Sequence, residues 1–311
     1  MKRIELFIFA GLFACGVLLA PSPAPPAEQE VLRPSAAPPR RVPERLTVAA
    51  YNVRRLGEKG KDLDALARVI RNFDICGLVE VQDEKSLALL AARLRSLTRR
   101  PWGFMYGEAT RRPGGSYTEA YGVVWRRDRA QTGDGVMGNV WDPGERFRHD
   151  PFMASFKRGN FDFTLILLHT RWTNDKHGSR RDEVMAAAAL VNRLRKRGNE
   201  KDFILMGDFN YSATSRILRD MAERGNLRRL TPGEPTTFKR DNSGYAHAYD
   251  HIYASRNTAE REFVPGLSRA LDVTRYLYGD AGTESMARSK RNVSDHLPVW
   301  AAFHVTASDD D

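Results

Sequence analysis

Cysteine is scarce in this 311-residue sequence, because Cys15 and Cys76 are the only two. A disulfide scaffold is therefore excluded, and no cysteine-rich motif indicates structural zinc. No stretch reaches the roughly 18 consecutive apolar residues of a clear membrane span. Apolar residues nevertheless make up 41% of the chain, which is enough for a hydrophobic core and excludes wholesale disorder.

Acidic residues are also fewer than basic ones. The 39 Asp and Glu residues stand against 49 Lys and Arg residues, so the formal net charge is +10. A surplus of this size indicates a polyanionic partner, either nucleic acid or an anionic membrane surface. Improved solubility is the competing explanation, so charge alone leaves the partner open.

The first residues have the pattern of an export signal. Lys2 and Arg3 precede a 15-residue apolar run from Leu6 to Ala20, which is short for a spanning helix but typical of a signal. We therefore expect residues 1–24 to be an export signal that sends the protein to the periplasm or out of the cell. An uncleaved membrane anchor is the alternative.

Composition divides the rest of the chain into three parts. Residues 21–43 hold eight of the sixteen prolines, which predicts a Pro-rich linker over residues 25–45. A catalytic domain is expected over residues 46–306, and residues 307–311 form an acidic tail. A domain of this length is large but ordinary for a two-sheet α/β enzyme.

Hydrophobic periodicity predicts the elements of that domain. Apolar runs predict strands over residues 46–53, 74–81, 117–125, 147–156, 161–169, 203–206, 249–254 and 298–304. Helical spacing predicts helices over residues 63–73, 87–97 and 184–194. Because hairpins alternate with βα units, we predict a four-layer α/β sandwich, in which two mixed β-sheets pack face to face between helices.

Polar residues recur where the predicted strands end. The positions are Asn52, Glu80, His169, Asp208, Asn210, Asp250, Asp295 and His296. Each residue taken alone could be a turn former or a helix cap. Together they supply hard oxygen ligands for Mg²⁺ or Ca²⁺ and two imidazoles for proton transfer, at the strand ends where α/β folds collect their ligands.

Several motifs in this order resemble one family. They are Tyr51-Asn52-Val53-Arg54, Val79-Glu80-Val81, Ser116-Tyr117-Thr118-Glu119, Leu168-His169, Gly207-Asp208-Phe209-Asn210, Tyr249-Asp250-His251-Ile252 and Ser294-Asp295-His296-Leu297-Pro298. The chain is similar to the endonuclease/exonuclease/phosphatase superfamily, and most of all to its deoxyribonuclease I branch. The resemblance extends from about residue 46 to residue 305.

The resemblance implies a role for each matching residue. Glu80 would be the principal metal ligand, with Asn52 beside it and Asp295 in support. The metal would be Mg²⁺, with Mn²⁺ and Ca²⁺ as alternatives. Glu119 would hold His169, and Asp250 would hold His296. Asp208 and Asn210 would face the scissile phosphate or a second cation. The general base is left open among His296, His169 and Asp208.

Contacts to DNA are implied for Arg54, Tyr117 and Arg148. Arg148 stands one place early, because the family's Arg-Glu-Pro segment is replaced by His149-Asp150-Pro151. Gln82 also replaces an arginine of the family pattern. Trp172 is either a stacking residue or a structural one.

The resemblance therefore predicts a metal-dependent endonuclease that hydrolyses DNA with little sequence preference. RNA is a further possible substrate, and the protein is expected to act as a monomer without a stable protein partner. The alternatives are a secreted sphingomyelinase-type phospholipase C, another phosphoesterase of the superfamily, or a catalytically inactive binding module.

Overall fold

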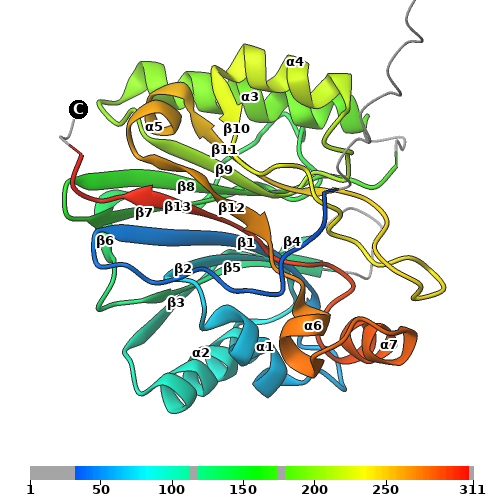
Figure 1. Cartoon of the computed structure of the whole chain (residues 1–311). Coiled ribbons are helices and arrows are strands. Elements are labelled where there is room, and N and C mark those ends of the chain that lie inside the picture. The colour runs from blue at the N-terminus through cyan, green and yellow to red at the C-terminus, as the bar shows by residue number, and fades with distance from the viewer. Residues whose placement is uncertain (1–31, 112–117, 174–178, 308–311) are drawn as a thin grey trace, which may run out of the picture. The chain divides into compact units, whose positions relative to one another are not determined.

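Two mixed β-sheets face each other in the computed structural model, and helices cover the outer face of each sheet (Figure 1). The structure describes residues 32–111, 118–173 and 179–307. The predicted export signal, Tyr117 and most of the acidic tail lie outside the described residues. Within the described part of the chain, no helix is long and apolar enough to cross a membrane. The predicted four-layer α/β sandwich is confirmed.

The first sheet has the strand order β12-β13-β1-β2-β5-β3, and β4 pairs with β5 beside this path. Its strands are β1 (Arg45–Leu56), β2 (Ile75–Val81), β3 (Trp102–Tyr106), β4 (Thr110–Arg111), β5 (Thr118–Arg126), β12 (Phe263–Ala270) and β13 (Val299–His304). β1 and β2 pair in parallel, whereas the other neighbours pair antiparallel.

The second sheet has the order β10-β11-β9-β8-β7-β6. Its strands are β6 (Gln131–Asn139), β7 (Phe152–Arg158), β8 (Phe161–His169), β9 (Phe203–Asp208), β10 (Leu227–Arg229) and β11 (Asp250–Ser255). β8 and β9 form its parallel pair, and the remaining pairs are antiparallel.

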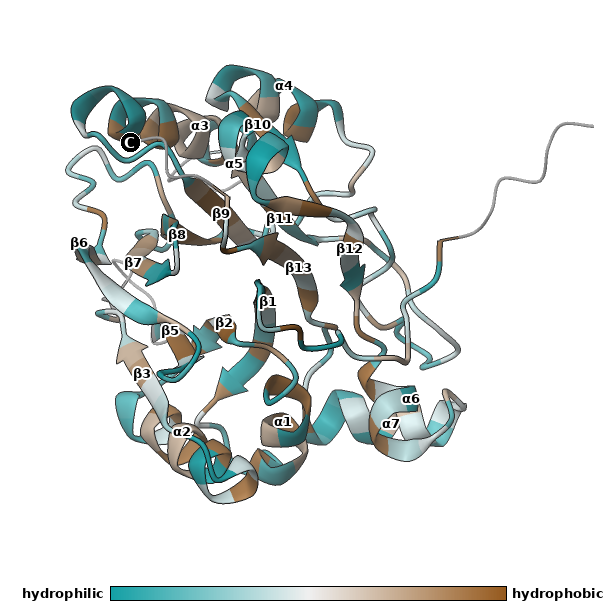
Figure 2. Ribbon diagram, turned by 60° about the vertical axis from the view of Figure 1, so that its left-hand side comes forward, coloured by the Kyte–Doolittle hydropathy of each residue, from teal (hydrophilic) through white to brown (hydrophobic). Residues whose placement is uncertain are grey.

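Helices form the two outer layers. They are α1 (Leu63–Ile70), α2 (Glu84–Thr98), α3 (Arg180–Arg197), α4 (Arg216–Gly225), α5 (Arg256–Arg261), α6 (Val273–Tyr278) and α7 (Thr283–Asn292). Buried residues of α1, α2, α6 and α7 pack on the first sheet, and those of α3 and α4 pack on the second. In Figure 2 the central strands β9, β11 and β13 are largely hydrophobic, whereas the outward turns of α3 and α4 are hydrophilic.

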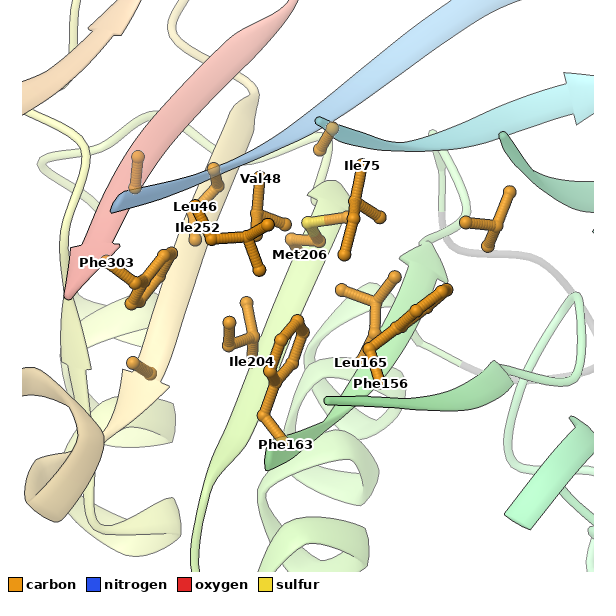
Figure 3. Packing of buried hydrophobic residues seen from close by; sticks show 14 of the residues in the cluster. Leu46, Val48, Ile75, Phe156, Phe163, Leu165, Ile204, Met206, Ile252 and Phe303 are labelled. Atoms are coloured by element: carbon orange, nitrogen blue, oxygen red, sulfur yellow. The ribbon is translucent and has the colours of Figure 1, made fainter. Parts of the chain in front are cut away.

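A continuous apolar layer fills the space between the sheets. Val48 and Ile75 of the first sheet belong to the same buried cluster as Leu165 and Met206 of the second (Figure 3). Gly77 lets the sheets approach closely, because a Cβ atom there would lie 2.6 Å from the Met206 side chain. This packing brings the strand ends of both sheets together.

The prediction lacks the edge strands β3, β6, β10 and β12, the short strand β4, and the helices α4, α5, α6 and α7. β6 lacks apolar alternation because it carries Gly133, Asp134 and Gly135. In β12, Pro265 and Gly266 interrupt the apolar pattern, and its pairing with β13 shifts register there. Edge strands tolerate such residues since only one side needs hydrogen-bonded partners.

The predicted strand over residues 147–156 is wrong in its first half, because β7 begins at Phe152. The Asp142 carboxylate accepts the backbone amides of Arg146 and Phe147 and so stabilises a loop. Pro151 has no amide proton to offer a neighbouring strand. Side-chain hydrogen bonding of this kind competes with regular structure.

Part of the Pro-rich segment lies against the domain. Ser35 forms a bridge with Leu271, and its backbone bonds to Ala270 and Asp272 are 3.0 and 2.8 Å long. At Ser35 the chain is therefore attached to the domain rather than separate from it.

Candidate active site

One row of polar residues crosses the second sheet where its parallel strands end. His169 of β8 is the register partner of Asp208 of β9, and Asp208 is the partner of Asp250 of β11. Since β8 and β9 are parallel, their carboxyl ends lie at the same edge of the sheet. His169 and Asp208 end their strands as predicted.

The first sheet contributes Asn52 and Glu80 from an irregular stretch of backbone. Arg54, Arg55 and Glu80 have φ angles of 43°, 54° and 63°, in a left-handed region that such residues seldom adopt. The pairing of β1 with β2 also shifts register after Asn52. Bulges of this kind re-aim side chains next to active sites, and here they accompany a Glu80 side chain that lines the site.

Each of two imidazoles is held by a buried carboxylate. His169 Nδ1 lies 2.5 Å from Glu119 Oε1, and His296 Nδ1 lies 2.8 Å from Asp250 Oδ2. Both pairings implied by the resemblance are therefore present. They orient the rings so that both Nε2 atoms face Asp208.

These pairs control the charge of the rings. Burial by itself lowers the pKa of His169, but Glu119 outweighs burial and raises this pKa to about 10. The pKa of His296 also rises well above its usual value, because Asp250 and Asp208 outweigh burial. Burial favours a higher pKa for Glu119, yet His169 and His149 lower it to about 2. Each carboxylate thus favours the protonated form of the ring that it holds.

Asp208 lies between the two imidazoles. Its Oδ2 atom is 3.7 Å from Nε2 of His169 and 3.7 Å from Nε2 of His296. Burial raises the pKa of Asp208 to about 6, although both rings counteract this effect. Asn52 Nδ2 donates to the same carboxylate at 3.1 Å, and the backbone amide of Asn210 donates at 2.9 Å. Asp208 is therefore the point on which both sheets converge.

The predicted metal ligands offer oxygen atoms suited to a hard cation. Asn52 Nδ2 donates to Glu80 Oε1 at 2.8 Å, while Asn52 Oδ1 accepts the Arg54 amide at 2.9 Å. Asn52 thus orients Glu80. Glu80 and Asp295 line the same cleft, and carboxylates are the ligands that Mg²⁺ and Ca²⁺ prefer. Both carboxylates thus offer oxygen ligands to a cation in the cleft. Among the described residues, the groups whose ligand atoms lie within 4.8 Å of one another are Glu119, His149 and His169, and Asp208, Asp250 and His296.

Arg54, for which a DNA contact is predicted, lies beside Asp295. Its Nε atom lies 3.7 Å from Asp295 Oδ2, and its guanidinium also donates to the Lys290 carbonyl. The guanidinium therefore lies beside a predicted metal ligand. The backbone at Arg54 is left-handed, with a φ angle of 43°, and the sequence contains no signal for this arrangement.

His149 belongs to the site but is absent from the predicted set. Its ring stacks on His169, with centroids 5.7 Å apart and planes at 11°. Its Nε2 atom lies 3.5 Å from the same Glu119 oxygen that His169 contacts. The only available signal was its position in the segment that departs from the family pattern.

Thr236 is a second residue that the sequence analysis missed. Its fully buried hydroxyl donates to Asp250 Oδ2 at 2.6 Å and accepts the amides of Tyr249 and Asp250. Thr236 therefore fixes the carboxylate that orients His296. A threonine in a loop carries no pattern that identifies such a contact.

The acidic residues and imidazoles line an open cleft of about 620 Å³. Five arginine and lysine side chains line it as well, namely Arg55, Arg148, Arg171, Arg240 and Lys290. Of the predicted DNA contacts, Arg148 thus lies in the cleft, whereas Tyr117 is outside the described residues. Asn210 also lines the cleft, with its Nδ2 atom bonded to the Thr170 carbonyl. Positive charge around a negatively charged centre suits a phosphate ester.

This sandwich, with two His–carboxylate pairs converging on a third carboxylate, defines a hydrolytic phosphoesterase of the α/β-sandwich class. The chain belongs to the Endonuclease/Exonuclease/phosphatase family, whose match covers residues 49–296. Family membership and the carboxylates in the cleft indicate that a divalent metal is used.

Two relatives and one solved structure illustrate the similarity. A deoxyribonuclease from Thioalkalivibrio sp. is 28% identical over 265 residues, covering 83% of this chain and 71% of the relative. Deoxyribonuclease gamma from Rattus norvegicus is 25% identical over 272 residues, covering 82% and 83%. The crystal structure of a family protein from Bacteroides thetaiotaomicron superposes with a TM-score of 0.57 at 19% identity, covering 86% and 96%. This structural match supports the fold alone.

Proposed function

We propose that the protein is a Mg²⁺-dependent endonuclease that hydrolyses the phosphodiester bonds of DNA with little sequence preference. The observation that carries the proposal is the convergence of two imidazoles on Asp208 beside Glu80. Such an arrangement offers a proton acceptor, a proton donor and a cation site around one phosphate.

The chain's own groups perform the proton transfers. A general base must be unprotonated, so the imidazole that takes a proton from the attacking water at Nε2 first has to lose its own proton. The other imidazole, in its protonated form, gives a proton to the leaving oxygen of the sugar. Following the family resemblance, we assign the base role to His296 and the acid role to His169, with Asp208 as the rival base. Glu119 and Asp250 keep each ring in the tautomer and orientation that this exchange requires.

A cation held by Glu80 and Asp295 would neutralise charge on the phosphate oxygens. Asn52 keeps Glu80 in place for this role. Because Arg54 pairs with Asp295 in the described structure, cation binding would have to compete with that guanidinium for the carboxylate.

The choice of DNA rests on charge and on the named relatives. Arg55, Arg148, Arg240 and Lys290 line the cleft, and the whole chain carries a net charge of +10. Non-specific DNA binding is largely electrostatic. Two similar proteins are named deoxyribonucleases, which supports DNA over other phosphodiesters.

The test compares three substrates under two conditions. Purified protein is incubated with supercoiled plasmid, RNA or sphingomyelin vesicles, in Mg²⁺ and in chelator. We expect plasmid nicking that requires the metal and that Glu80→Gln reduces strongly. If the plasmid stays supercoiled while sphingomyelin is cleaved, the protein is a phospholipase C instead. If no substrate changes, the proposal of an active nuclease is wrong.

We further propose that residues 1–24 direct export and that the catalytic domain acts as a monomer. The basis for the export proposal is the charged and apolar pattern of residues 1–24. Fractionation of cells expressing the full chain should place activity in the periplasm or medium, and light scattering should give the mass of one chain. Activity that stays in the cytoplasm would contradict export, and activity that stays with the membrane would indicate an anchor.

A further inference from the structure

Three aromatic rings form a ledge beside the catalytic groups. Trp172 and Tyr249 meet edge to face with centroids 5.4 Å apart, and Tyr249 stacks on His247 at 4.8 Å. All three line the same cleft as His169 and His296. We refer to Trp172, Tyr249 and His247 as the aromatic ledge.

Trp172 does not serve the hydrophobic core. Its exposed fraction is 57%, whereas Trp102, Trp125 and Trp300 are at most 5% exposed. Most of the Trp172 side chain is thus open to the cleft, and its indole offers an accessible face to a ligand. Buried packing therefore does not account for its position.

Hydrogen bonds to buried residues hold the backbone next to two rings of the ledge. Arg171, the residue before Trp172, is bound through its backbone amide and Nε to the buried Glu183 carboxylate, at 2.9 and 3.0 Å. The Tyr249 amide donates to Thr236 at 3.1 Å. Rings fixed before a ligand arrives lose little entropy when it binds.

The ledge also lies close to the catalytic groups along the chain. Tyr249 directly precedes Asp250, which orients His296, and Trp172 follows His169 by three residues. Because the rings and the imidazoles line one cleft, the nucleotide next to a phosphate bound at the imidazoles would enter the part of the cleft that these rings line. Arg240 and Lys290 line the same cleft and supply charge for the flanking backbone.

We infer that the aromatic ledge is a nucleobase subsite, where an unpaired base next to the scissile phosphate stacks on Trp172. This inference rests on the proposed nuclease function and adds the state of the substrate. Bases in a duplex already cover each other's faces, so stacking requires a base that is single-stranded, frayed or flipped. The protein should therefore favour DNA that is unpaired next to the cut. Aromatic stacking is tolerant of sequence, which agrees with low sequence preference.

The test couples the ring to the base. A labelled single-stranded oligonucleotide carries one cleavable phosphodiester among phosphorothioate linkages, which keep the charge of the backbone, with the base on either side kept or replaced by an abasic site. Wild type, Trp172→Ala, Trp172→Phe and the control Trp141→Ala are compared. Trp141 is 83% exposed but does not line the cleft. Affinity is measured in chelator and cleavage in Mg²⁺.

We expect one abasic replacement to weaken binding to wild type by about tenfold. Trp172→Ala should lose a similar factor with the intact base and become insensitive to the abasic site, since the two changes remove one contact. Trp172→Phe should retain most of the effect, and Trp141→Ala should behave as wild type.

Two kinds of failure are distinguishable. If wild type cleaves the oligonucleotide but the abasic penalty is equal in wild type and Trp172→Ala, the subsite is wrong and the nuclease function stands. If wild type cleaves neither the oligonucleotide nor plasmid, the proposed function fails and the subsite falls with it.

Discussion

At the scale of single residues, the site depends on how each polar group is partnered. The two imidazoles differ from ordinary histidines because Glu119 and Asp250 hold them at 2.5 and 2.8 Å. Both rings approach Asp208 to the same distance of 3.7 Å. We therefore expect the proton transfers to depend on these five residues together, that is, on the two imidazoles of His169 and His296, their partners Glu119 and Asp250, and Asp208.

Replacing either histidine should remove one proton transfer. His169→Ala and His296→Ala are each expected to lower the single-turnover rate of DNA cleavage by about 100-fold or more. The double variant should not multiply these losses, because both rings serve one transition state. His304→Ala, at the end of β13 and outside the cleft, is the matched control. Near-normal rates in both single variants would contradict the acid–base roles of the histidines, and catalysis would then depend on Asp208 and the cation.

Arg54 should influence the cation as well as DNA. Its guanidinium lies 3.7 Å from Asp295, so Arg54→Ala should lower the Mg²⁺ concentration needed for half-maximal activity. DNA affinity in chelator should fall by at most about 1–3 kcal/mol. Arg93→Ala serves as control, because Arg93 pairs with Asp64 on the outer helices. An unchanged Mg²⁺ requirement would show that the pair with Asp295 has no effect on the cation.

At the scale of elements, α3 fixes two loops that carry site residues. Glu183 in its first turn is fully buried. One carboxylate oxygen accepts the Arg148 amide at 2.6 Å, and the other accepts two bonds from Arg171. The loop before β7 and the loop after β8 are thereby attached to one helix end.

Glu183→Ala should therefore be strongly destabilising. Loss of one partner from a buried ion pair typically costs about 3–5 kcal/mol, and we expect a decrease in unfolding free energy of that order. Asp182→Ala removes an exposed acid from the same helical turn and should change stability by less than about 1 kcal/mol. Urea denaturation followed by circular dichroism measures both. Equal effects would mean that Glu183 does not hold the loops.

At the scale of the whole molecule, positive charge should govern substrate binding. The net charge of +10 favours contacts to the DNA backbone, and Gln82 replaces one arginine expected at the site. DNA affinity should thus fall steeply between about 50 and 200 mM salt. Binding of the protein releases counterions from the DNA backbone, and added salt opposes that release. A flat response in a fluorescence anisotropy titration would contradict a binding face that depends on phosphate contacts.

Acid should destabilise the fold through His251. Burial lowers its pKa to about 4, below the value of about 6.5 expected when the chain is unfolded. Its contribution to stability is complete above pH 6.5 and is lost as the pH falls from 6.5 to 4, because the unfolded chain binds the proton first. The lost free energy is about 3 kcal/mol.

The control for this prediction is His251→Gln, which cannot titrate. The difference in unfolding free energy between wild type and His251→Gln should change by about 3 kcal/mol between pH 7 and pH 4. Parallel stability curves over that range would exclude His251 as the source of the acid sensitivity.

The outline of the fold was predictable because it depends on local patterns. Continuous apolar runs identified β1, β2, β8 and β9, which are buried on both faces. The polar residues that close these strands could be recognised for the same reason. β6 and β12 could not be predicted, since an edge strand needs neither apolar alternation nor freedom from proline and glycine.

The sequence by itself determined the family, the two-sheet sandwich and the candidate residues of the site, because strand ends and short motifs are local properties of the chain. Only the tertiary structure decided which partner each group has. It placed His149 on the Glu119 carboxylate and turned Arg54 toward Asp295. It also joined Asn52 to Asp208 across 156 positions of the chain. Contacts over such separations arise from the packing of two sheets, and no local pattern records them.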